Sequence, residues 1–131
     1  MQGNVFSNAD EDWYSFTANA GEKVYAAVIT SFSSSGSTDA QLRIFASDGT
    51  TVIEFDEDDG TLGGLSSTIA GATIPSNGTY YLQVKHFSAT NTLRGYDLYL
   101  KVQTGAPTPE IESNDNQATA NPMPASGWVS G

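Results

Sequence analysis

The chain has 131 residues, which is enough for one domain with its own hydrophobic core. Its 15 acidic residues against 5 basic residues give a net charge of −10, which disfavours nucleic acids and anionic membrane surfaces as partners. There is no cysteine, which excludes disulfides and thiol chemistry, and no apolar run approaches the roughly 20 residues that cross a membrane. The composition therefore favours cations, basic proteins and neutral polymers as partners.

Short runs of β-branched and aromatic residues, separated by Gly, Asn, Asp and Ser, predict that the chain is all-β. The predicted strands, in chain order, are residues 13–17, 22–32, 42–45, 52–55, 65–74, 79–85 and 94–102. Side chains alternate between the two faces of a strand, so Tyr80, Leu82 and Val84 share one face and Tyr81 lies on the other. Several short strands, each with one apolar face, predict an antiparallel β-sandwich.

Two turn motifs and one proline-containing stretch indicate how the chain is divided. Asp48-Gly49 and Asn77-Gly78 predict tight turns before a returning strand. The acidic stretch 56–60 lacks the regular spacing of an EF-hand loop, and we interpret it as a solvated turn. Proline in the stretch 104–109 interrupts both helix and strand. We therefore expect a sandwich body over residues 1–103, a linker over 104–109 and a separate segment over 110–131.

The segment after the linker begins with a dense set of oxygen-bearing side chains. Glu110, Glu112 and Asp115 supply three carboxylates, and Asn114 supplies an amide oxygen, within six residues. Ca²⁺ takes six to eight such oxygens, so this segment can supply about half of a coordination sphere. The alternative is a solvated polar linker whose carboxylates only repel one another.

The end of the chain suggests a repeat. Val129-Ser130-Gly131 would run naturally into Asn4-Val5-Phe6, with Gly131 in the place of Gly3, which gives a period of 131 − 3 = 128 residues. We therefore expect that the segment 110–131 opens a further copy of the module, although one period does not prove a repeat.

Six stretches together resemble a known family. They are Asp10-Glu11-Asp12-Trp13-Tyr14-Ser15-Phe16, Ala20-Gly21-Glu22-Lys23-Val24, Leu42-Arg43-Ile44-Phe45 with Asp48-Gly49, Asn77-Gly78-Thr79-Tyr80-Tyr81-Leu82-Gln83-Val84, Gly95-Tyr96-Asp97-Leu98, and Glu112-Ser113-Asn114-Asp115 with Ala118-Thr119-Ala120. In their order they resemble the bacterial pre-peptidase C-terminal domain, a family that includes the collagen-binding domains of clostridial collagenases. The last stretch resembles the family's opening signature, which here comes at the end.

The resemblance implies a jelly-roll-like β-sandwich with a non-catalytic role beside secreted peptidases, other hydrolases or large surface proteins. Collagen-binding members hold Ca²⁺ with the opening acidic segment and with Asp residues just before the first aromatic strand. Carried over by position, this implies as calcium ligands Glu110, Glu112, Asn114, Asp115, Asp10 and Asp12.

A candidate ligand face lies on the outward side of the predicted strands 79–85 and 94–102. We expect Tyr81, Gln83, Lys85 and Tyr99 to form an aromatic and polar surface for a sugar or peptide. Collagen-binding relatives are rich in Tyr on this outer face, whereas Gln83 and Lys85 stand here, so collagen as the ligand does not carry over. Ordinary cross-strand packing of exposed aromatic side chains explains the same pattern.

Catalysis is not expected. His86 is the only histidine, so a Ser-His-Asp triad would have to use it, and a zinc site lacks His and Cys ligands. Pairs of carboxylates arise easily in so acidic a chain and do not indicate a glycosidase.

These observations predict a non-catalytic, calcium-binding β-sandwich module of a secreted or cell-surface bacterial protein. Its role would be to bind substrate or position a neighbouring domain, with an extracellular protein, a polysaccharide or neighbouring repeats as partners. The alternatives are a carbohydrate-binding module with an aromatic face and a structural repeat of a large adhesin. The acidic segment either folds back onto Asp10 and Asp12 of its own chain or reaches a neighbouring copy.

Overall fold

The structure is a computed structural model that describes residues 1–5, 9–30, 38–58 and 65–131. The described strands, in chain order, are β1 (Gln2–Val5), β2 (Glu11–Ala18), β3 (Lys23–Ile29), β4 (Ala40–Phe45), β5 (Val52–Asp56), β6 (Ser67–Thr73), β7 (Gly78–His86), β8 (Leu93–Gln103), β9 (Thr108–Pro109) and β10 (Val129–Ser130). One 3₁₀ turn covers Gln117–Thr119. In this part of the chain no helix is long and apolar enough to span a membrane.

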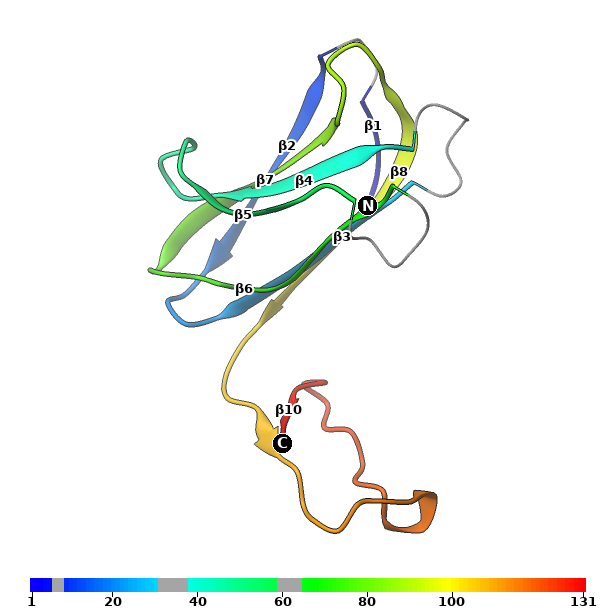
Figure 1. Cartoon of the computed structure of the whole chain (residues 1–131). Coiled ribbons are helices and arrows are strands. Elements are labelled where there is room, and N and C mark those ends of the chain that lie inside the picture. The colour runs from blue at the N-terminus through cyan, green and yellow to red at the C-terminus, as the bar shows by residue number, and fades with distance from the viewer. Residues whose placement is uncertain (6–8, 31–37, 59–64) are drawn as a thin grey trace.

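Two antiparallel sheets of four strands form the body of the molecule (Figure 1). The first sheet has the order β1-β8-β3-β6 and the second has the order β2-β7-β4-β5. Neighbouring strands within each sheet are antiparallel, and the buried apolar residues come from both sheets. The predicted all-β, antiparallel sandwich is therefore confirmed.

The core follows the predicted alternation. Tyr80, Leu82 and Val84 of β7 are buried, and so are Leu42 and Ile44 of the neighbouring strand β4. Each of these strands lies in the interior of its sheet, where strands on both sides and the facing sheet exclude water. Burial of apolar surface at about 25 cal/mol per Å² then stabilises the sandwich.

The Asp48-Gly49 turn forms as expected between β4 and β5. Asp48 Oδ1 accepts hydrogen bonds from the backbone N–H of Thr50 and of Thr51 at 2.8 Å, and Oδ2 accepts from Thr51 Oγ1 at 2.6 Å. These bonds favour the ionised carboxylate and lower the pKa of Asp48 to about 2, with the Thr51 hydroxyl as the largest cause. Gly49 has a φ of 68°, a conformation that glycine adopts without strain.

The sequence patterns missed some elements. β1 was not predicted, because Val5 is the only strongly apolar residue among its four. The predicted strand 22–32 is seen as β3, and its residues 31–32 lie outside the described residues, as do residues 59–60 of the acidic stretch.

Residues 104–131 lie outside the sandwich, beyond the end of β8 (Figure 1). Within this segment β9 and β10 form a short parallel pair, and most of its side chains are exposed. The last strand of the sandwich, β8, ends at Gln103.

Ile44 and Val52 give a matched test of the core. Ile44→Ala should lower the free energy of unfolding by about 2–5 kcal/mol, because it leaves a cavity between fully packed strands. Val52→Ala, on the exposed edge strand β5, should cost less than about 1 kcal/mol. Urea unfolding followed by tryptophan fluorescence measures both, and equal losses would contradict the assigned core.

Candidate functional site

The predicted calcium ligands of the C-terminal segment gather around Asn114. Its side-chain Nδ2 donates to Glu110 Oε2 at 3.1 Å, and its backbone N–H donates to Glu112 Oε2 at 3.2 Å. Asp115 lies next to them, and its Oδ2 accepts from Ser113 Oγ at 2.9 Å. The carboxylate of Glu110 thus meets the side-chain amide of Asn114, and that of Glu112 meets the backbone N–H of the same residue, in an exposed loop.

Asp10 and Asp12 lie at the start of β2. Asp10 Oδ1 accepts the backbone N–H of Glu11 at 3.0 Å. Asp12 Oδ2 accepts the hydroxyl of Tyr96 at 2.5 Å, which joins β2 of one sheet to β8 of the other. Because the Tyr96 hydroxyl has only one proton, the hydroxyl of Tyr14 donates to it, at 2.6 Å.

Tyr96 is held tightly in this network. Its side chain is fully buried, and its ring lies so close to Gly3 that a Cβ there would be 2.2 Å from the ring. Burial, together with the hydrogen bond to Asp12, raises the pKa of Tyr96 well above its usual value. One carboxylate oxygen of Asp12 is therefore already occupied by the hydrogen bond from the Tyr96 hydroxyl.

The two halves of the predicted calcium site lie at opposite ends of the sandwich (Figure 1). Glu11 pairs with Lys85 near the end of β7, and β8 starts at this same end with Leu93. The 11 residues of β8 then carry the chain about 30 Å to the other end, where the segment 104–131 begins. Among the described residues no three His, Cys, Asp or Glu side chains gather where they could hold a metal ion.

The structure separates the four residues of the predicted ligand face. Tyr81, Gln83 and Lys85 belong to β7 of the second sheet, whereas Tyr99 belongs to β8 of the first sheet. Tyr99 points outward beside Ala27 of β3, on the other side of the sandwich. The expectation of one shared face was therefore wrong, because alternation along a strand does not say which strands become neighbours.

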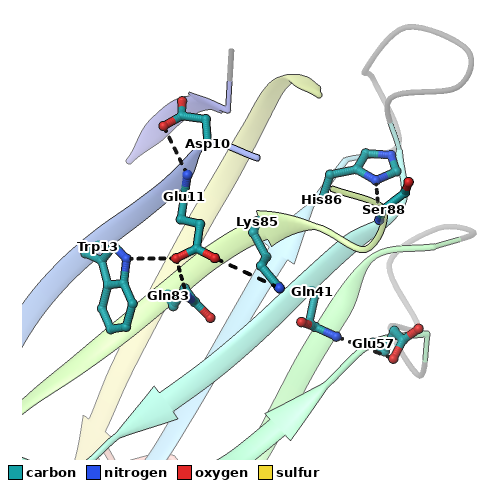
Figure 2. Close-up of polar contacts among 9 residues, drawn as sticks. All are labelled: Asp10, Glu11, Trp13, Gln41, Glu57, Gln83, Lys85, His86 and Ser88. Atoms are coloured by element: carbon teal, nitrogen blue, oxygen red, sulfur yellow. Dashed lines mark hydrogen bonds and ion pairs between the residues drawn. The ribbon is translucent and has the colours of Figure 1, made fainter. Parts of the chain in front are cut away.

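Glu11 organises the outer face of the second sheet (Figure 2). Its Oε2 accepts hydrogen bonds from Gln83 Nε2 at 2.7 Å and from Trp13 Nε1 at 3.3 Å, and its Oε1 lies 4.0 Å from Lys85 Nζ. The indole ring of Trp13 in turn packs on Phe45, with ring centroids 4.9 Å apart. The result is a fixed polar and aromatic surface in which Trp13 is 45 % exposed.

Two glutamines beneath this surface have unused acceptors. Gln83 and Gln41 are buried, and the Oε1 atom of each lacks a hydrogen-bond partner among the described residues. Gln41 Nε2 makes one long contact, at 3.5 Å, with Glu57 Oε2 (Figure 2). A buried carbonyl oxygen without a donor costs about 1–3 kcal/mol, so both atoms lower the stability of this face.

His86 is placed as a structural side chain at the end of β7. It is buried, and its Nδ1 accepts the backbone N–H of Ser88 at 2.9 Å, so that Nδ1 carries no proton (Figure 2). Its Nε2 has no partner in the described part of the chain. Nearby, burial raises the pKa of Asp39 above its usual value, and the charge of Asp58 adds to this.

Sequence reasoning missed Trp13 and Glu11 as members of this surface. The signal was present, because Tyr14 and Phe16 face the core, and alternation then places Trp13 outward. What the sequence did not contain is the register that brings Glu11 against Lys85.

The fold and this surface define a two-sheet antiparallel β-sandwich module with a polar and aromatic outer face. Residues 10–86, more than half of the chain, match the family described as the bacterial pre-peptidase C-terminal domain. The chain belongs to this family, as the sequence resemblance predicted.

Solved structures agree in fold. The pre-peptidase C-terminal domain of a collagenase from Bacillus anthracis is 17% identical with a TM-score of 0.54, over 77% of this chain and 86% of that one. PliG of Aeromonas hydrophila, a periplasmic inhibitor of g-type lysozyme, is 21% identical with a TM-score of 0.55, over 79% of this chain and 83% of that one. No curated protein matches the chain.

The Tyr96 network gives a second test. Tyr96→Phe removes one hydroxyl and leaves Tyr14 and Asp12 without their shared partner, so the free energy of unfolding should fall by about 1–3 kcal/mol. Tyr99→Phe is the control, because this exposed side chain should lose less than about 0.5 kcal/mol. Denaturant unfolding measures the free energy of unfolding of both variants. An unchanged value for Tyr96→Phe would contradict the proposed role of the network.

Proposed function

We propose that this chain is a non-catalytic binding module of a secreted or cell-surface bacterial protein. Its ligand would be an extracellular protein or polysaccharide, held on the outer face of the sheet β2-β7-β4-β5. The observation that carries the proposal is the surface around Glu11, where an exposed indole is held in place by fixed polar side chains. Such a mixture of an aromatic anchor and a few fixed polar groups is typical of ligand sites.

The side chains of this surface suit ligand binding better than catalysis. Trp13 and Tyr81 offer ring faces, and Lys85 offers a cation. The histidine is buried and its Nδ1 is already used by the Ser88 backbone, so it does not supply a base to a surface-bound substrate. These features support a role in holding a ligand or positioning a neighbouring domain.

We further propose that Ca²⁺ binds the loop formed by Glu110, Glu112, Asn114 and Asp115. The convergence of two carboxylates on Asn114 supports this, because Ca²⁺ prefers several carboxylate and amide oxygens at one point. Bound there, the ion would cross-link the loop and neutralise its carboxylates.

The remaining ligands would come from a neighbouring copy. Asp10 and Asp12 of the same chain lie at the far end of the sandwich, whereas the corresponding end of a copy placed next in series would meet the loop. This favours closure between modules over closure within one chain, and it fits the expected period of 128 residues.

Calcium removal tests the metal proposal. Adding Ca²⁺ should protect the stretch 104–115 from proteolysis and raise the fraction of chains that associate, and EDTA should reverse both, since binding to one state stabilises it by mass action. The double variant Glu110→Gln with Glu112→Gln should lose the response, whereas Glu54→Gln, which removes an exposed carboxylate from the sandwich, should keep it. Limited proteolysis, calorimetric titration and sedimentation measure this. A wild-type protein indifferent to Ca²⁺ in all three would contradict the proposal.

Trp13 tests the ligand face. Trp13→Ala should reduce retention on an insoluble polymer, chosen from fibrillar collagen, cellulose and chitin, by about 30-fold, as expected for an aromatic hot spot. Tyr99→Ala, on the opposite sheet, should bind as wild type. Circular dichroism confirms that both variants fold.

The outcomes separate the alternatives. Retention on cellulose or chitin alone would make the module carbohydrate-binding. Loss of retention in Tyr99→Ala but not in Trp13→Ala would contradict the chosen face. Wild-type protein that binds none of the three polymers would favour a structural repeat of a large adhesin.

A further inference from the structure

The side of the sandwich formed by β5 and β6 carries a cleft that shares no residue with the Glu11 surface. β5 and β6 are the edge strands of their sheets, and they lie next to each other (Figure 1). The cleft has a volume of about 390 Å³ and is lined by residues 54–56 of β5 and 68–73 of β6. Ligand sites commonly occupy about 300–1,000 Å³, so the cleft is large enough to hold part of a partner.

The cleft gives access to backbone groups of β6. An edge strand presents N–H and C=O groups that its own sheet does not pair, and among the described strands β6 pairs only with β3. The N–H of Thr68 points away from β3 and donates to Asp56 Oδ2 at 2.6 Å. Because these groups alternate in direction along an antiparallel strand, the N–H and C=O of Ala70 point to the same side as the N–H of Thr68.

β6 has few of the features that usually protect an edge strand. Its sequence contains neither a charged residue nor a proline. Its small residues Ala70, Gly71 and Ala72 leave room for an approaching backbone. The register shift at Gly71, whose φ is 87°, limits regular pairing to the half of the strand before it.

The negative charge of the cleft favours a basic partner. Glu54 and Asp56 line it, and none of the lining residues is Lys or Arg. A second copy of this chain paired through β6 would bring the same carboxylates, and a net charge of −10 on each copy, against each other. A strand with basic side chains would instead gain charge complementarity.

We propose that the cleft between β5 and β6 binds an extended, lysine- or arginine-bearing peptide segment of a partner protein. The segment adds as a strand to the edge of β6 through main-chain hydrogen bonds around Ala70, and a basic side chain meets Glu54. Asp56, which already accepts the N–H of Thr68, marks the end of the added strand.

Amide NMR of the full chain tests this inference. The probe is an end-blocked heptapeptide of alternating valine and lysine, and its control is the matched valine and glutamate peptide. The lysine peptide should shift the amides of residues 54–56 and 68–72 with saturation, and the glutamate peptide should bind at least about tenfold more weakly. Ala70→Pro, which removes an N–H that faces away from β3, should weaken the lysine peptide by about tenfold or more.

Glu54→Gln and Glu112→Gln form a matched pair of variants. Both remove one exposed carboxylate, but only Glu54 lines the cleft, so only Glu54→Gln should weaken the lysine peptide. These two variants and the shift map decide the question even where Ala70→Pro fails to fold. The proposal is overturned by equal binding of both peptides, by shifts on other strands or by the absence of saturable shifts. Dimers of the free chain that shift the same amides would overturn it in favour of a second copy.

Discussion

The hydrogen bonds from Tyr14 to Tyr96 and from Tyr96 to Asp12 tie the two sheets together on one side of the sandwich. They cross from β2 to β8 at the fully buried Tyr96, and its two partners Asp12 and Tyr14 are half-buried. Asp12 and Tyr14 must point inward to make them, which turns Glu11 and Trp13 outward on the same strand. The position of the candidate ligand face thus follows from a contact in the interior.

The two sides of the sandwich differ in how the sheets are joined, because the Tyr14–Tyr96–Asp12 hydrogen bonds lie on one side. On the side of β1 and β2, the ring of Tyr96 rests on Gly3, and the strands close over the network. On the side of β5 and β6, one carboxylate of β5 bonds to one N–H of β6, and a cleft remains between the strands. The contacts of this edge with the other sheet lie at Ser67 and Thr68, so the backbone groups further along β6 stay accessible, which is the condition for adding a strand.

The alternation of residues within each strand predicted the strands. The candidate site depends instead on which strands pair, and this involves residues far apart in the sequence. Tyr80, Leu82 and Val84 alternate so regularly that the core face of β7 follows from the sequence. The grouping of Tyr81 with Tyr99 failed because β7 and β8, although consecutive in the chain, belong to different sheets. No periodicity within a strand contains that information, since it depends on which loop crosses over the end of the sandwich. The contact of Glu11 with Gln83 was missed for the same reason, because it needs the register of β2 on β7.

The stability of the outer face does not come from its charges. The Lys85 and Glu11 side chains are partly exposed and 4.0 Å apart, and such pairs contribute about 0–1 kcal/mol. Their effect is to hold Glu11 where it accepts from Gln83 and Trp13, which fixes an aromatic ring that would otherwise rotate in solvent. A ring ordered before binding loses less conformational entropy when a ligand arrives, so in the binding role that we propose more of the interaction free energy would remain as affinity.

The length of the sandwich determines where the segment 104–131 leaves it. β8 carries the linker away from Asp10 and Asp12, and the segment buries few side chains of its own, with Ile111 and Met123 both more than 70 % exposed. A polypeptide that exposes its apolar residues gains little from its own packing. In the arrangement of modules in series that we propose, the acidic loop of one module would face the aspartates at the start of β2 in the next. The acidic loop would then link the modules, and its stiffness would depend on whether Ca²⁺ is bound.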